Sequence, residues 1–175
     1  MLLRTLSAAC LLFALAAQAS AQFDPATADP DASDVADNGD VFITFREDVG
    51  LDQIYRFARW DGTTWTAYDS YIEARVFPLP RLEVLDITPT ASGDALWVGG
   101  SFAEAVDASG TVVPVQNVAR LDLATDSWSA LGAGVDGPVF DLDSDGAGGF
   151  VAGGQFTASG PTTLNYIGRW DGTAW

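Results

Sequence analysis

The chain has 175 residues, with 24 Asp and Glu against eight Lys and Arg and no His, so its formal net charge is −16. Such an acidic chain is a poor partner for nucleic acid, because phosphate binding depends on Lys and Arg that neutralise the backbone. The absence of His excludes the Ser-His-Asp and Cys-His catalytic groups and the usual zinc sites from this chain.

The first 21 residues predict a secretory signal peptide. Arg4 supplies the charged start, an apolar run extends from Leu6 to Ala17, and small residues close the segment at 19–21. The apolar run is shorter than the roughly 20 residues that a membrane span needs, so no transmembrane segment is expected. Cleavage before Gln22 would remove Cys10, the single cysteine, and leave a chain without disulfides. We expect a secreted, extracellular or cell-surface protein.

The rest of the chain predicts a short leader and then an all-β domain. Residues 22–34 are rich in Asp, Pro and small residues, a composition typical of a disordered, solvated leader. From Val35 onward, short runs of Val, Ile, Phe, Trp and Leu alternate with clusters of Gly, Asp, Ser and Pro. No stretch keeps a helical period over three turns, which favours strands throughout 35–175.

A heptapeptide occurs twice, as RWDGTTW at 59–65 and as RWDGTAW at 169–175. A looser copy, with an Arg, an Asp and a Trp in the same order, lies at 120–128, so the chain divides into three repeat units. The units cover about 35–66, 83–134 and 135–175, and residues 66–82 form an insertion. The Asp-Gly pairs at 61–62 and 171–172 predict tight hairpins with type I′ turns, in which both residues have positive φ.

Two further patterns recur between the units. Two glycines followed by Phe predict close strand packing or a bulge, and the Trp after each hairpin predicts a packing anchor between units. The structural repeat positions are therefore Trp65, Gly99, Gly100, Phe102, Trp128, Gly153, Gly154, Phe156 and Trp175.

The order of an apolar run, two glycines, a variable loop, Leu121-Asp122 and Trp128 resembles the kelch repeat of β-propellers. The pattern Gly-Gly-x-Phe, long loop, Arg-Trp-Asp-Gly is also similar to kelch-related repeats of exported bacterial proteins and of cortical cell-polarity marker proteins. The resemblance implies four-stranded blades. About three blades make an incomplete ring, since propellers have typically 4 to 8. We therefore expect a fragment or an oligomerising part, with further blades from a longer chain or an oligomer; the alternative is an open β-repeat stack.

A possible metal site lies at Asp141, Asp143 and Asp145, which follow the D-x-D-x-D-G order that opens a calcium loop. The positions that would complete an EF-hand loop are Gly149 and Ala152, which carry no side-chain ligand. We expect a structural turn here, with calcium as the alternative and no other cofactor.

The segments that follow the Gly-Gly-x-Phe strands, 103–116 and 157–164, are the most variable between units, and loops on a rigid β scaffold commonly carry binding. Val112, Val113 and Val115 make the first segment apolar, which predicts either a partner surface or an extra strand packed on its own unit. We expect a non-catalytic binding module for a protein or glycan partner. The alternatives are part of a polysaccharide hydrolase with paired carboxylates, and a purely structural surface repeat.

Overall fold

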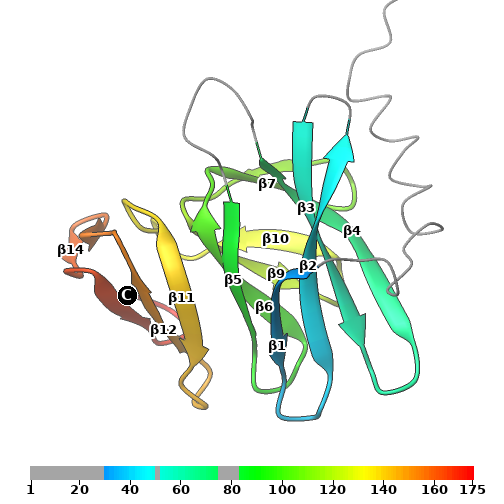
Figure 1. Cartoon of the computed structure of the whole chain (residues 1–175). Helices are drawn as coiled ribbons and strands as arrows, with labels where there is room; N and C mark the ends of the chain where they lie inside the picture. Colours follow the sequence, from blue (N-terminus) through cyan, green and yellow to red (C-terminus); the bar gives the residue numbers. More distant parts are fainter. Residues whose placement is uncertain (1–29, 50–51, 75–82) are drawn as a thin grey trace, which may run out of the picture.

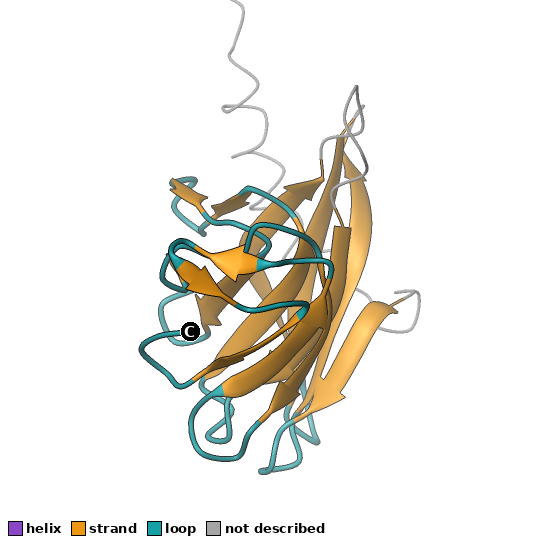
Figure 2. Cartoon of the chain, turned by 90° about the vertical axis from the view of Figure 1, so that its left-hand side faces the viewer, coloured by secondary structure: helices purple, strands orange, loops and turns teal. Residues whose placement is uncertain are grey.

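The computed structural model describes residues 30–49, 52–74 and 83–175 (Figure 1). These residues form strands joined by loops, and the all-β prediction is confirmed (Figure 2). Within these ranges no helix is long and apolar enough to cross a membrane. The predicted signal peptide, residues 22–29 of the predicted leader, and Pro78 and Pro80 of the insertion lie outside the described residues.

The first sheet begins as an antiparallel meander of β1 Pro30–Val35, β2 Val41–Val49, β3 Asp52–Trp60 and β4 Trp65–Ala74. Strand β1 starts earlier than the expected beginning of the fold near Val35. Its sequence is polar, but Ala32 packs on the core and Pro30 stands at the first position of an edge strand, where a missing N–H costs least. Pairing with β2 therefore overrides the local composition.

The second sheet has the order β10-β9-β6-β5. Its strands are β5 Glu83–Pro89, β6 Ala95–Ser101, β9 Val118–Asp122 and β10 Ser127–Ala130. The third sheet has the order β11-β12-β15, with β11 Val139–Ser144, β12 Phe150–Gly154 and β15 Ile167–Trp170. A two-stranded hairpin, β13 Ala158–Ser159 with β14 Thr162–Thr163, stands between β12 and β15.

The variable segment 103–116 forms a hairpin of β7 Glu104–Val106 and β8 Val112–Pro114. The hairpin packs against its own unit, since Trp128 Nε1 donates to Val106 O, but it pairs with no other described strand of that unit. Instead β7 pairs with β4, so the first sheet becomes six-stranded with the order β1-β2-β3-β4-β7-β8. Val115 is buried and Val113 partly buried in the core between the first two sheets, which explains the apolar character of the segment.

The three sheets stack face to face around two apolar cores. One core joins the first and second sheets and includes Phe42, Phe57, Leu96 and Trp128. The other joins the second and third sheets and includes Trp97, Val118, Leu142 and Phe150. Strand β5 lies between β1 and β11, so these first strands of the three units run side by side (Figure 1). We call the face of the second or third sheet toward the preceding sheet its front face, and the opposite one its back face. The front face of the first sheet is the one that points away from the second sheet.

Strand pairing gives the alignment of the units directly. Trp60, Leu121 and Trp170 each follow the Arg that recurs in the three units. Their partners on the neighbouring strands are Val41, Leu96 and Phe150, respectively, and these three residues are therefore equivalent. In the same register Gly99 is equivalent to Gly153, and Val118 to Ile167.

Candidate binding site

The hairpin carboxylates bind the backbone of their own turns. Asp61 Oδ1 accepts hydrogen bonds from Thr63 N and Thr64 N, both at 2.8 Å, and from the Thr63 hydroxyl at 2.7 Å. Asp171 makes the same contacts with Thr173 and Ala174. Only the glycines of these turns have positive φ, and Asp61 N donates to Thr64 O, so the loops have four residues. The type I′ prediction is wrong, because a side-chain acceptor stabilises a longer loop.

The three carboxylates of the predicted calcium loop have different environments. Asp145 Oδ1 accepts from Ala147 N at 2.8 Å and Gly149 N at 2.9 Å, while its Oδ2 accepts from Arg169 Nη2 at 2.6 Å. These backbone amides, and then the guanidinium, lower the pKa of Asp145. Asp141 and Asp143 are exposed on β11. Nowhere in the described part of the chain do three acidic side chains form a metal-binding group, and calcium at this loop stays a prediction.

The carboxylates on the side-by-side strands β1 and β5 connect the sheets. Asp86 Oδ2 accepts from Leu142 N on β11 at 2.6 Å, and its Oδ1 accepts from Ile87 N at 2.9 Å. Asp34 Oδ2 accepts from the Thr88 hydroxyl at 2.8 Å. Burial raises the pKa of Asp86, and the neighbouring charges of Asp141 and Asp34 act in the same direction. Both described contacts are structural, since each fixes one sheet to the next.

Gly99 and Gly154, one glycine from each pair, mark places where backbones or sheets approach closely. A Cβ on Gly99 would lie 2.7 Å from Val139 Cγ1 of the third sheet, and a Cβ on Gly154 would lie 2.1 Å from Pro138 O. Gly100 and Gly153 are their partners in the pairs. In both units the strand opposite the pair has a register irregularity, between Val84 and Asp86 and between Val139 and Asp141. The phenylalanines that follow, Phe102 and Phe156, are each buried in one of the two cores.

The tryptophans after the hairpins differ in their contacts. Trp128 lies against Phe57 of the first sheet, with ring centroids 5.4 Å apart, and its Nε1 donates to Val106 O of β7. Trp175 packs against Phe150 at 5.5 Å, and its Nε1 donates to Leu131 O. Trp65 is half-buried and packs against Trp60 at 5.6 Å.

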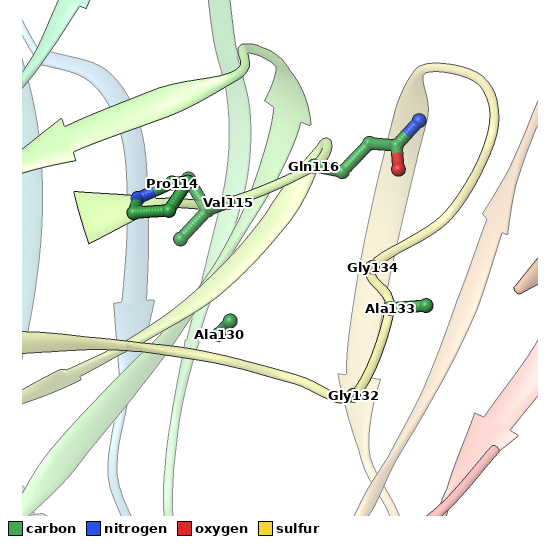
Figure 3. A pocket seen from close by; sticks show the side chains of 7 residues that line it. All are labelled: Pro114, Val115, Gln116, Ala130, Gly132, Ala133 and Gly134. Carbon is green, nitrogen blue, oxygen red and sulfur yellow. The ribbon is translucent and has the colours of Figure 1, made fainter. Parts of the chain in front are cut away.

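A pocket of about 240 Å³ lies where the second unit passes to the third (Figure 3). One wall is the end of the β7–β8 hairpin and the other is the chain that leaves β10. The residues that line it are uncharged: Pro114, Val115, Gln116, Ala130, Gly132, Ala133 and Gly134.

The walls of this pocket are held together by hydrogen bonds. Val135 N donates to Gln116 O at 3.0 Å, and Asn117 Nδ2 donates to Val135 O at 2.8 Å. A Cβ on Gly134 would lie 2.4 Å from Gln116 O, so only glycine permits this approach. Gly132 and Gly134 both have positive φ. Sequence reasoning named the wall at 114–116 as part of a possible partner surface, but it did not place the second wall, for which the Gly-x-Gly spacing at 132–134 was the signal.

No family model matches the chain, and neither a curated protein nor a solved structure is significantly similar to it.

Proposed function

We propose that this chain is an exported, non-catalytic binding module of the kelch-like repeat type, and that its pocket receives a side chain of a protein partner. The pocket itself is the observation that carries the proposal, because it is small and uncharged on a strongly acidic chain. Its volume of about 240 Å³ is below the roughly 300–1,000 Å³ typical of small-molecule sites. A single partner side chain suits it better than a buried metabolite.

Charge favours this surface over the rest of the molecule. No charged residue occurs in 108–119 or in 127–135, the two segments that supply the walls. Burying uncharged atoms against a partner avoids the desolvation penalty that carboxylates would bring. Val112, which is 52 % exposed on β8, extends the uncharged surface beyond the pocket.

Strand β8 adds a second mode of contact. It is the last strand in the order of the six-stranded sheet, and within the described residues its outer edge has no paired strand. An extended segment of a partner can add to such an edge by backbone hydrogen bonds while a side chain enters a neighbouring pocket. The geometry therefore supports a protein partner in extended conformation.

The described carboxylate contacts support a non-catalytic role. Asp34 and Asp86 accept donors that fix one sheet to the next, and Asp145 accepts donors from its own loop and from Arg169. Carboxylates used in this way are not displayed toward a substrate, as the paired carboxylates of a glycoside hydrolase must be.

The test is to present the chain to a displayed library of short uncharged peptides and, in parallel, to a glycan array. We expect peptide binding that Ala133→Glu reduces at least tenfold, because it places a charge in the pocket. Ala147→Glu is the matched control, since it makes the same change at another exposed alanine outside the pocket. Binding confined to glycans, equal binding by both variants, or release of sugar from a polysaccharide would each overturn the proposal.

A further inference from the structure

We propose that the back face of the third sheet is a docking surface for the front face of the first sheet of a second copy of this chain. The surface comprises Asp141, Asp143, Val151, Gly153 and Ile167. The equivalent residues on the back face of the second sheet are covered by the third sheet. The contacts that those residues make indicate what would cover the back face of the third sheet.

The clearest pair is Gly99 and Gly153. A Cβ on Gly99 would lie 2.7 Å from Val139 Cγ1 and 3.1 Å from Leu142 Cδ1, so this position must be glycine for the third sheet to pack. A Cβ on Gly153 would meet no atom of the described residues within 4 Å. Gly153 has no positive φ that would call for glycine. The space above Gly153 is therefore the space that another sheet occupies above Gly99.

The neighbouring apolar positions repeat the difference. Val118 is fully buried against the third sheet, whereas its equivalent Ile167 is 62 % exposed. Trp97 is buried at 3 % exposure, whereas its equivalent Val151 is only half-buried. An Ile exposed to this extent on the face of a sheet is costly in water, and a docked sheet removes that cost.

A polar contact repeats as well. Asp86, opposite Gly99, accepts the amide of Leu142 from the next sheet, and Asp141 is the equivalent carboxylate opposite Gly153. Leu142 pairs with Ala152, and the residue at that position in the first sheet is Ser33, which pairs with Ile43. In the docked arrangement Asp141 accepts the amide of Ser33 of the second copy.

The front face of the first sheet is the complementary surface within this chain. Val35 is 58 % exposed, Ser33 is exposed, and Val41, Trp60 and Trp65 are half-buried. The equivalent residues of the second sheet include Leu96, Leu121 and Trp128, which pack on the first sheet. A second copy therefore extends the same sheet-on-sheet contact head to tail, which is a heterologous interface.

The test is sedimentation equilibrium of the full chain over a wide concentration range. Because the net charge of −16 makes copies repel, the measurement is made at about 0.15 M and about 0.5 M salt, and association is expected to strengthen with salt. Gly153→Leu fills the space of the docked sheet and is expected to raise the dissociation constant at least tenfold. It leaves the monomer folded, as judged by circular dichroism, because the added side chain meets open space.

Ile167→Glu is expected to weaken association to the same extent. Ala124→Leu is the control, because Ala124 is exposed in the loop between β9 and β10 of the second sheet. This variant should leave the association unchanged. A chain that stays monomeric at every concentration and salt overturns the proposal. So does association that neither Gly153→Leu nor Ile167→Glu weakens, since it would use another surface.

Discussion

The second and third sheets share a strand register but not an environment. Gly99 and Val118 are covered by the third sheet, whereas no sheet of the described residues covers Gly153 and Ile167 at the equivalent positions. The side chains at these positions are alike in size and polarity, so burial in this repeat is set by the neighbouring sheet and not by residue type. Matched substitutions at equivalent positions measure what that neighbour contributes.

The largest difference is expected between the two tryptophans that follow β9 and β15. Trp128→Ala should lower the free energy of unfolding by about 3–5 kcal/mol, because the ring is buried between two sheets and its N–H donates to Val106 O. Trp175→Ala should cost less, because that ring is partly exposed. Urea unfolding of both variants gives the comparison, and equal losses would contradict it.

The glycine pair comes next. Gly99→Val should cost about 1–3 kcal/mol, because its side chain overlaps Val139 and Leu142 and forces the sheets apart. Gly153→Val should stay within about 0.5 kcal/mol of the parent in dilute solution, where copies do not associate. Thermal unfolding at low protein concentration measures both. A large loss in the Gly153 variant would show that its space is needed within one chain.

The carboxylate pair should show a smaller difference. Asp86→Ala removes the acceptor of the Leu142 amide, which should cost about 1–2 kcal/mol. Asp141→Ala removes an exposed carboxylate and should cost less than about 0.5 kcal/mol. Denaturant midpoints of the two variants decide the point. A larger loss of stability for Asp141→Ala than for Asp86→Ala would contradict the comparison, because it would mean that the exposed Asp141 carboxylate makes a stabilising contact.

Acid should destabilise the protein through the hairpins that the units share. The Thr63 and Thr125 hydroxyls lower the pKa values of Asp61 and Asp122, and the Ala174 amide lowers that of Asp171. A carboxyl with a lowered folded-state pKa stabilises the fold above its unfolded pKa of about 3.9, and this stabilisation is lost as the pH falls. Asp86, whose pKa is raised, acts in the opposite direction, since its contribution is lost as the pH rises.

Because the three hairpin carboxyls oppose the half-buried carboxyl of Asp86, we expect the melting temperature to fall as the pH is lowered below about 4. Asp61→Asn should flatten that dependence relative to the parent. A melting temperature that is constant or rises on acidification would contradict the assignment.

Calcium should have the smallest effect. Asp145 already accepts donors at both oxygens, which favours the structural turn over a metal site. Millimolar calcium is expected to leave the melting temperature unchanged and to produce no heat of binding in titration calorimetry. A rise that Asp143→Asn removes would show instead that the loop binds calcium.

Local patterns in the sequence predicted the fold well where the contacts are local. Short apolar runs separated by clusters of Gly, Asp, Ser and Pro predicted the strands, and the Arg-Trp-Asp-Gly copies located the hairpins that join β3 to β4 and follow β15. The turn type was missed because the hydroxyls of Thr63 and Thr173 donate to the carboxylates of Asp61 and Asp171. Such local side-chain hydrogen bonds compete with a turn that needs positive φ at the Asp.

Contacts between distant segments could not be predicted in the same way. The polar strand β1 forms only because β2 offers it an edge, and β7 pairs with β4 because that edge is within reach in the folded molecule. The pocket depends on the close approach of Gly134 to Gln116, two residues that are distant in the sequence. A sequence pattern records which residues tolerate such an approach but not which segments meet.

The pairing of β7 with β4 has a consequence for the order in which the chain can fold. Tyr71 and Ile72 pair with Val106 and Ala105, residues that are synthesised well after β4. During that interval the outer edge of β4 is unprotected, and an unpaired edge can recruit another strand. Folding of the first sheet is therefore complete only when part of the second unit is present.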